Sequence, residues 1–209
     1  MYLVIGNGKT GSEVIKRIPE NQLLEVCDSK HLPTLDLMKK ATCVIVFIPA
    51  QAFEEMKSLF IESNVPMVIG TTGVSFEGIQ VSAPWIVGSN FSLGVNVLIK
   101  LIRGMSQLNS QDLIQKVQIY EEHHIHKKDK PSGTALYLKS LFPKHSVDIE
   151  AHRKNDVKGF HSVTLDLEGE TIHLEHTALD RGIFAKGALF AASKIEGLSP
   201  GIYRFEEMF

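Results

Sequence analysis

The residues best suited to chemistry gather in one short stretch between Glu121 and Ala135. Its first part, residues 121–130, holds three histidines and three lysines. An imidazole can donate or accept a proton near neutral pH, and an ammonium group can bind or stabilise negative charge. A Pro-Ser-Gly-Thr turn follows at 131–134, and an apolar run from Ala135 to Phe142 then has helical character. The pattern indicates proton transfer beside a bound anion.

This stretch must be positioned by the elements on either side of it. Residues 117–120 have the pattern of a strand, which delivers the imidazoles and ammonium groups to the turn. Ser132, Gly133 and Thr134 would then lie at a helix N-terminus, where free backbone N–H groups and hydroxyls form an anion site. The alternative is a solvated basic loop with an ordinary Ser or Thr cap.

The composition is that of an ordinary globular protein. The chain has 209 residues, 44% of them hydrophobic, and its net charge of −2 gives no indication of a nucleic-acid partner. No apolar run approaches the roughly 20 residues of a membrane span, and the N-terminus has the pattern of a strand and not of a secretion signal. Cys27 and Cys43 have the surroundings of buried free thiols. We therefore expect a cytoplasmic protein with neither a membrane nor a nucleic-acid partner.

A glycine-rich loop follows the first apolar run, Tyr2 to Ile5. It has the pattern G-x-G-x-x-G and precedes residues 12–18, which have helical spacing. Such glycines let the backbone turn tightly and approach a pyrophosphate at the helix N-terminus. The candidate cofactor-binding residues of this loop are Gly6, Gly8, Lys9, Thr10 and Gly11. The alternative is a purely structural glycine turn; a Walker A loop fits less well because the four residues that separate its first glycine from its Gly-Lys-Ser/Thr ending are absent.

An acidic residue, Asp28, follows the second predicted strand at 23–27 and lies 20 residues after Gly8. At this spacing an acid meets the ribose hydroxyls of adenosine in dinucleotide-binding proteins. Asp28 favours NAD, whereas the neighbouring Ser29 and Lys30 are able to accept the 2′-phosphate of NADP. The sequence therefore predicts NADH, NADPH or both as the cofactor.

Further apolar strands are predicted at 41–48, 65–69 and 85–88, with a helix at 51–62. Strands that alternate with helices predict a parallel doubly wound sheet, whose ligands bind outside the carboxyl ends of the strands. Two loops at those ends carry small, amide or hydroxyl residues that suit a nicotinamide carboxamide, with ordinary turn chemistry as the alternative. Their residues are Gly70, Thr71, Thr72, Ser89, Asn90 and Phe91.

The character of the chain changes after Phe91. An amphipathic helix is predicted over 94–108, and clean alternation over 162–168 and 171–176 predicts an antiparallel hairpin with one apolar face. A last helix is predicted at 188–195. The predicted fold class is α/β, with a Rossmann-like doubly wound parallel sheet and a second α+β domain built on a mixed or antiparallel sheet.

The stretch at 121–135 resembles a long pattern of the 4-hydroxy-tetrahydrodipicolinate (dihydrodipicolinate) reductases of lysine and diaminopimelate biosynthesis. That pattern is E-x-H-H-x-x-K-x-D-A-P-S-G-T-A, and Lys130 is the one departure from it. The chain is also similar to the family at G-T-T-G, A-N-F-S-x-G-V-N, R-x-x-F-A-x-G-A and G-x-Y, which begin at residues 70, 89, 181 and 201. It is compact between Asp28 and Val44, and its first fingerprint has Lys9 and Thr10 where the family usually has Arg-Met.

The resemblance implies NAD(P)H-dependent reduction of a small ring that carries two carboxylates. His123 would be the proton donor, and Lys127 would be its partner and stabilise the developing negative charge. The substrate would be bound by His124, Ser132, Gly133, Thr134 and Arg181.

The resemblance further implies a homotetramer, assembled through the antiparallel sheets of the second domain. We expect residues 1–91 with about 182–209 to form the dinucleotide-binding domain. Residues from about 92 to 181 should form the substrate-binding and oligomerisation domain.

Two alternatives concern the same stretch. His123, His124 and His126 offer metal ligands, but zinc usually takes four, and alternation along a strand sends neighbouring side chains to opposite faces. We therefore predict no metal. A nucleotide-binding sensor with a decayed site would have lost His123, Lys127 or the Ser-Gly-Thr turn, and all of them are present.

Overall fold

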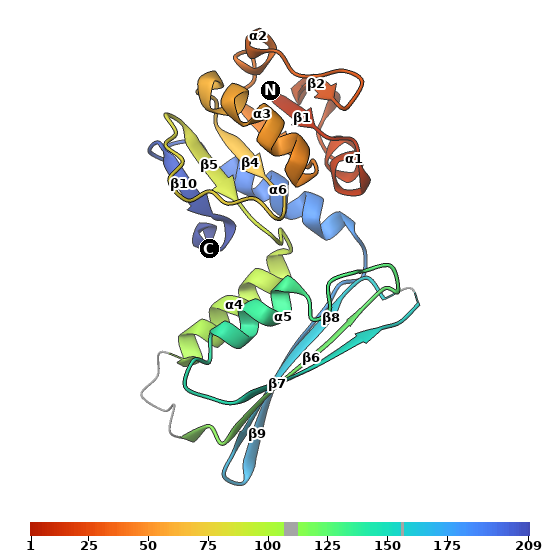
Figure 1. The fold of residues 1–209 in the computed structure, drawn as a ribbon, viewed down its shortest axis with the longest axis vertical. Coiled ribbons are helices and arrows are strands. Elements are labelled where there is room, and N and C mark those ends of the chain that lie inside the picture. The colour runs from red at the N-terminus through yellow and green to blue at the C-terminus, as the bar shows by residue number, and fades with distance from the viewer. Residues whose placement is uncertain (107–112, 156) are drawn as a thin grey trace. The chain divides into compact units, whose positions relative to one another are not determined.

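The computed structural model describes residues 1–106, 113–155 and 157–209. The chain divides into two compact units (Figure 1). The first unit combines Met1–Leu93 with Gly182–Phe209, and the second is Gly94–Arg181. None of the helices in the described ranges is long and apolar enough to cross a membrane.

The first unit is built on six parallel strands in the order β10-β5-β4-β3-β1-β2. The order reverses at β1, which lies between β2 and β3, and ligands of doubly wound sheets bind at such a switch point. The strands are β1 (Tyr2–Ile5), β2 (Leu23–Cys27), β3 (Cys43–Val46), β4 (Met67–Ile69), β5 (Pro84–Val87) and β10 (Gly201–Arg204).

Helices cover both faces of this sheet, which confirms the doubly wound prediction. On one face, α1 and α6 pack through Val14 and Ala188 against β-strand side chains such as Ile45. On the other face, α2 and α3 pack through Met38 and Phe53. The helices are α1 (Lys9–Ile15), α2 (Leu35–Met38), α3 (Ala50–Ser63) and α6 (Gly182–Lys194), with 3-10 turns η1 (Glu20–Gln22) and η3 (Phe205–Met208).

Several boundaries in the first unit differ from the sequence prediction. Helix α1 begins at Lys9 and not at Ser12, because Gly8 is already its N-cap. Helix α6 begins at Gly182 and not at residue 188, so its first half is the small-residue segment that was not predicted as helix. Helix α2 and strand β10 were not predicted at all; both are four residues long and so give weak periodic signals.

The second unit is a four-stranded mixed sheet in the order β7-β6-β8-β9. Strands β6 and β7 are parallel, whereas β8 is antiparallel to both β6 and β9. Gly169 makes the β8–β9 turn with a φ of 73°, a left-handed conformation that favours glycine. The strands are β6 (Lys116–His123), β7 (Val147–Arg153), β8 (Phe160–Leu167) and β9 (Glu170–Thr177).

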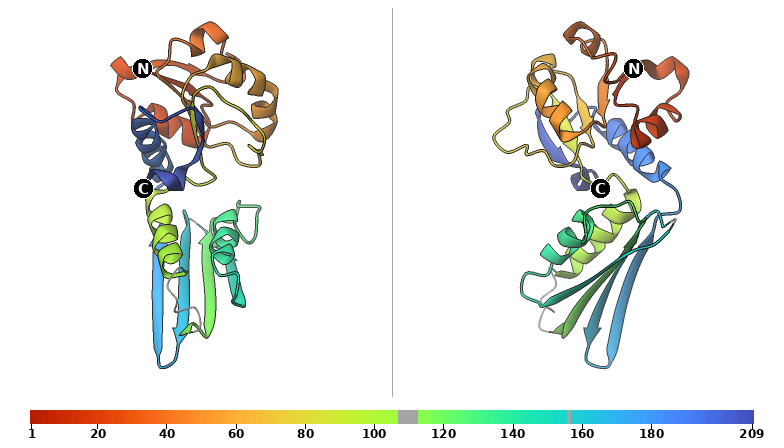
Figure 2. Two further views of the ribbon diagram at one scale, coloured as in Figure 1. Left: turned by 90° about the vertical axis from the view of Figure 1, so that its left-hand side faces the viewer. Right: turned by 45° about the vertical axis from the view of Figure 1, so that its right-hand side comes forward.

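Two helices, α4 (Leu93–Ser106) and α5 (Gly133–Ser140), pack against the same face of this sheet (Figure 2). Their shared core includes Ile102, Ala135 and Val163. The predicted continuation of α4 through 107–108 lies outside the described residues. Because β6 and β7 are parallel, α5 forms the crossover between them, and the loop that enters α5 lies at the carboxyl end of β6.

Candidate active site

The end of β6 places two ionisable side chains on the buried face of the second sheet. Alternation buries Val117, Ile119, Glu121 and His123, and the last two are 0% and 8% exposed. Glu122 has a partner on the opposite face, Lys154. The strand therefore points a carboxylate and an imidazole at the turn that opens α5.

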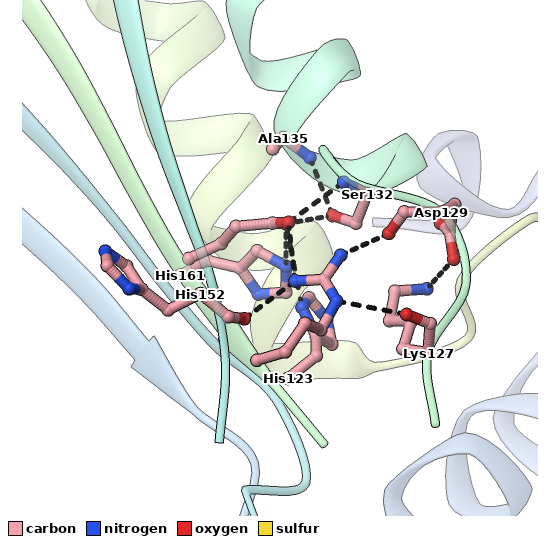
Figure 3. Close-up of polar contacts among 9 residues, drawn as sticks. His123, Lys127, Asp129, Ser132, Ala135, His152 and His161 are labelled. Atoms are coloured by element: carbon pink, nitrogen blue, oxygen red, sulfur yellow. Dashed lines mark hydrogen bonds and ion pairs between the residues drawn. The ribbon is translucent and has the colours of Figure 1, made fainter. Parts of the chain in front are cut away.

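The Glu121 carboxylate holds that turn. Its Oε1 accepts a hydrogen bond from the backbone N–H of Ser132 at 2.9 Å, and its Oε2 accepts one from the Ser132 hydroxyl (Figure 3). The same hydroxyl accepts from the N–H of Ala135 at 3.2 Å and so caps α5. Glu121 thus fixes the N-terminus of α5 against the end of β6.

Arg153, the last residue of β7, holds the loop between the histidines and the turn. Its Nη1 lies 3.3 Å from Glu121 Oε1, and its Nε donates to the carbonyl of Lys127 at 3.1 Å. Its Nη2 donates to the carbonyl of Asp129. The Lys127 ammonium lies 2.9 Å from the Asp129 carboxylate and has a partly exposed side chain. The loop therefore presents one fixed cation beside the turn.

A second histidine, His161 on β8, shares the carboxylate with His123. Glu121 Oε2 lies 3.7 Å from Nδ1 of His123 and 3.8 Å from Nε2 of His161. The two rings meet edge to face with centroids 4.9 Å apart. Contacts of this length are longer than hydrogen bonds, and both imidazoles face the same buried carboxylate.

Burial keeps both imidazoles neutral at neutral pH. It lowers the pKa of His123 to about 4; Glu121 acts in the opposite direction, while Lys127 and Arg153 add to the decrease. Burial also lowers the pKa of His161 to about 3, with smaller contributions from His123, His176 and Lys127. Of the two, His123 carries the more accessible proton.

Two of the other predicted substrate residues, His124 and Arg181, line a separate cavity of about 250 Å³. His126 and Lys158 line the same cavity. The structure therefore separates His123 from His124 and His126. This pocket combines two cationic side chains, Lys158 and Arg181, with a concave shape, which suits an anionic ligand.

The trio Glu121, His123 and His161 has metal-ligand chemistry, since one donor atom from each lies within 4.8 Å of the others. Arg153 and the Ser132 N–H and hydroxyl already satisfy the carboxylate, however, and the guanidinium places a positive charge where a cation would bind. We therefore interpret the trio as a proton-donor cluster.

In the first unit, the three fingerprint glycines have different surroundings. A Cβ on Gly6, whose φ is 104°, would lie 2.2 Å from the Phe47 carbonyl oxygen. A Cβ on Gly11 would lie 1.8 Å from the Gly6 carbonyl oxygen, whereas one on Gly8 would meet nothing within 4 Å. Gly6 and Gly11 thus permit the tight turn and close packing, and Gly8 leaves room for a pyrophosphate.

Asp28 is joined to this loop. Its Oδ2 accepts from the Asn7 side chain at 2.8 Å, and its Oδ1 accepts from the N–H groups of Lys30 and His31 at 2.8 and 3.1 Å. These two backbone N–H groups lower the pKa of Asp28, so it is ionised at neutral pH. Lys9 and Thr10 follow in the first turn of α1.

The remaining predicted cofactor residues follow β4 and β5. Gly70 packs closely, since a Cβ there would lie 2.0 Å from the Phe47 ring. Among the described residues, the buried Thr71 hydroxyl has no hydrogen-bond partner, and it belongs to the same loop as Thr72. In the next loop, Asn90 accepts from the N–H of Ser92, and Ser89 precedes it. Phe91 is part of the core, with its ring centroid 4.6 Å from that of Phe205.

Three residues of the site were not singled out from the sequence: Glu121, Arg153 and His161. Glu121 lies two residues before His123, so the strand period alone places it on the same face. Arg153 ends β7, which the sequence did not predict, and His161 lies one residue before the predicted start of its strand. Their convergence depends on strand register, which sequence periodicity leaves open.

Comparison with known proteins places these features in a family. The family model described as "Dihydrodipicolinate reductase, C-terminus" matches residues 94–209. The 4-hydroxy-tetrahydrodipicolinate reductase of Stenotrophomonas maltophilia is 39% identical over 173 residues, covering 78% of this chain and 71% of that protein. The enzyme of the same name from Methanoregula boonei is 33% identical over 209 residues, covering 88% and 81%.

A solved structure has a similar fold along the whole chain. It is the dipicolinate-bound dihydrodipicolinate reductase from Paenisporosarcina sp. TG-14, with a TM-score of 0.75 and 21% sequence identity. The match covers 100% of this chain and 99% of that one. The likeness supports the architecture of both units.

Proposed function

The chain belongs to the 4-hydroxy-tetrahydrodipicolinate (dihydrodipicolinate) reductase family, and from this premise we propose that it reduces 4-hydroxy-tetrahydrodipicolinate to tetrahydrodipicolinate, with loss of the 4-hydroxyl group as water, in lysine and diaminopimelate biosynthesis. The observation that carries the proposal is the strand–turn–helix of β6 and α5. It brings His123, Lys127 and the Ser132 turn together through Glu121 and Arg153. A nicotinamide cofactor bound to the first unit supplies the hydride.

In this proposal His123 supplies the proton and Lys127 stabilises the negative charge that develops on the ring. His123 is neutral in the empty site because burial lowers its pKa to about 4. A bound dianion favours the imidazolium and raises that pKa, so substrate binding itself charges the donor. The imidazolium acid therefore forms when the substrate is bound beside His123.

The two carboxylates of the substrate need fixed donors and cations. We assign them to Lys127, the N–H groups and hydroxyls of Ser132, Gly133 and Thr134, and the basic cavity. The turn offers the N-terminus of an eight-residue helix. The cavity adds His124 and Arg181.

We assign dinucleotide binding to the unit formed by Met1–Leu93 and Gly182–Phe209. The residues fit the cofactor: the backbone at Gly8 is open for a pyrophosphate, and Asp28 lies beside the loop to pair with ribose hydroxyls. The Gly70-Thr71-Thr72 and Ser89-Asn90 loops lie at the same edge of the sheet and would meet the nicotinamide. Phe91 supports the second of these loops from the core.

NADH should serve at least as well as NADPH, because the Asp28 carboxylate repels a 2′-phosphate and pairs with ribose hydroxyls. Lys30 opposes this preference. The test measures oxidation of each cofactor in the presence of the freshly made product of the preceding synthase. A preference for NADPH of tenfold or more in KM, about 1.4 kcal/mol, would count against Asp28 as the ribose acceptor.

Two alanine substitutions separate cofactor binding from folding. Gly8→Ala should leave the thermal midpoint unchanged and weaken NADH binding by about tenfold or more, since its methyl group enters the open space. Gly11→Ala should instead lower the free energy of unfolding. Alanine is more favourable than glycine in a helix by about 1 kcal/mol, but a Cβ that overlaps the Gly6 carbonyl costs about 1–3 kcal/mol or more. Calorimetry of both variants measures the two effects, and a Gly8→Ala protein that binds NADH normally would contradict the pyrophosphate assignment.

We also assign oligomerisation to the second unit and propose a homotetramer formed through the sheet face that α4 and α5 leave uncovered. That face carries a hollow of about 490 Å³ lined by residues including Tyr120, Ser162 and His173. A sedimentation measurement of the particle mass tests the assembly.

A further inference from the structure

The Glu121 side chain is fully buried, yet the proposed reaction gives it no role. A buried carboxylate is costly unless its charge and its oxygen atoms are satisfied. Here the Ser132 N–H and hydroxyl, the Arg153 guanidinium and two imidazoles all face it. Holding the α5 turn would need only the hydrogen bonds from Ser132. The placement of His123 and His161 beside the same oxygen is a separate feature.

The charged and titratable groups around His123 come from four elements. Glu121 shares its strand β6, Lys127 and Asp129 lie on the loop, Arg153 on β7 and His161 on β8. His176 on β9 lies beyond His161. The two cations oppose a charged imidazole, and His161 stays neutral.

Only the two carboxylates favour the imidazolium, and they are not equivalent. Asp129 is 53% exposed at its side chain and pairs with Lys127, so solvent and a counter-charge both weaken its effect. Glu121 is 0% exposed, and its Oε2 lies 3.7 Å from Nδ1 of the ring. A buried charge acts more strongly because the surrounding dielectric is lower. Glu121 is therefore the main counter-charge available to a protonated His123.

The geometry also separates the two ring nitrogens of His123. Nδ1 faces the Glu121 carboxylate. The other nitrogen, Nε2, lies on the side of the ring next to Gly159, where an added Cβ would be in ordinary van der Waals contact with Nε2 and Cδ2 at 3.7 Å. A carboxylate at one nitrogen fixes the proton there and directs the other nitrogen toward the substrate.

We propose that Glu121 is the positioning residue of the proton donor: its carboxylate faces Nδ1, compensates the charge of the imidazolium and leaves Nε2 to deliver the proton. The inference rests on the proposed function for the role of His123, but the contact itself does not. Contacts of this kind are often long in unliganded enzymes and shorten in the reacting complex. Because the same Oε2 accepts from Ser132, Glu121 also fixes the donor relative to the anion-binding turn.

The test compares the removal of a negative charge, by the isosteric change Glu121→Gln, with the removal of a positive charge, by Arg153→Gln. NMR titration of the His123 ring should show that Glu121→Gln lowers its pKa by about one unit or more, because the counter-charge is lost. Arg153→Gln should raise the same pKa, because a nearby cation is lost. The basic limb of kcat should move in the same two directions, and Glu121→Gln should reduce kcat at neutral pH by about tenfold or more.

A purely structural role predicts a different outcome. Misfolding or loosening would lower kcat at every pH in both variants and would not shift the His123 pKa in opposite directions. Glu121→Asp retains the charge and should restore part of the pH profile. If Glu121→Gln does not fold, as judged by circular dichroism, Glu121→Asp still tests the coupling: its shorter side chain moves the carboxylate away from Nδ1 and should lower the His123 pKa, and an unchanged pKa in that variant would also overturn the inference. An unchanged His123 pKa in folded Glu121→Gln overturns the inference.

The readouts distinguish this inference from the function on which it rests. The ring titration needs neither substrate nor turnover, so it tests the Glu121–His123 coupling by itself. If His123→Gln keeps full turnover, the proposed function of His123 fails whatever the titration shows. If His123→Gln loses turnover while Glu121→Gln has wild-type titration and pH profile, only the role of Glu121 fails.

Discussion

Replacement of His123 by glutamine should reduce kcat by about 10²–10⁴-fold and leave the dissociation constant of NADH unchanged. Loss of a general acid has this magnitude and acts on turnover, because the proton is needed in the transition state. Glutamine keeps a polar side chain at the buried position but has no titratable proton. Steady-state kinetics and fluorescence titration with NADH measure the two quantities. His145→Gln is the control, since His145 lies beyond the far end of α5 and outside the proposed site.

If His123 is the acid, kcat/KM and kcat should each change with pH in a definite direction. The parameter kcat/KM reports the free enzyme, in which burial lowers the pKa of His123 to about 4. Its value should therefore fall as the pH rises above that range, because the imidazolium disappears. The basic limb of the kcat profile should lie at higher pH than that of the kcat/KM profile, since the bound dianion favours the charged ring. The assignment would be contradicted if His123→Gln retained the basic limbs of the kcat/KM and kcat profiles. It would also be contradicted if His145→Gln reduced kcat as much as His123→Gln does.

Replacement of Lys127 by alanine should reduce kcat by about 10²-fold and also raise KM for the substrate. One lost donor to developing negative charge has about this effect on turnover, and a lysine also anchors a carboxylate in the ground state. The Lys127 ammonium is held at the turn by Asp129 and by the Arg153 contact to its own carbonyl.

The adjacent Lys128 provides a matched control, since it has the same charge and is exposed. Lys128→Ala should change neither parameter by more than a few fold, as expected for an exposed charge. Pyridine-2,6-dicarboxylate should inhibit wild type competitively and inhibit Lys127→Ala more weakly. If pyridine-2,6-dicarboxylate inhibits Lys127→Ala and Lys128→Ala equally, general electrostatic attraction, and not a specific contact with Lys127, holds the dicarboxylate.

The sequence predicted the parallel sheet well because its central strands are buried on both faces. Residues 43–46 are all buried, so the strand appears as a continuous apolar run that no amphipathic helix would show. The glycine loop was equally clear, since Gly6 and Gly11 permit contacts that a Cβ would block. Both signals are local, and each can be detected within one segment.

Two edge strands, β7 and β10, gave much weaker signals. Strand β7 alternates polar and apolar residues and lies at the edge of its sheet, and the sequence did not predict it. Without β7 there was no reason to place Arg153 beside Glu121, 32 residues earlier in the chain. Strand β10 is likewise at an edge and was taken only as the end of the chain.

The histidines illustrate what depends on tertiary structure. His123, His124 and His126 are close in sequence, but the structure groups His123 with His161 and lines a cavity with the other two. Strand alternation predicted that the three would not converge. The pairing with His161 depends on the β6–β8 register, in which Glu121 lies opposite His161. No local pattern contains that register.

Hydride transfer is tested most directly by isotope labelling. NADH that carries deuterium at both C4 positions of the nicotinamide is mixed with the protein and the freshly made synthase product in ordinary water. If the proposed function is right, the cofactor is oxidised and the tetrahydrodipicolinate formed carries a single deuterium by mass spectrometry. The His123→Gln variant should bind the labelled cofactor but form labelled product about 10²–10⁴-fold more slowly. Unlabelled product, or no oxidation of NADH or NADPH by the wild-type protein, would contradict it.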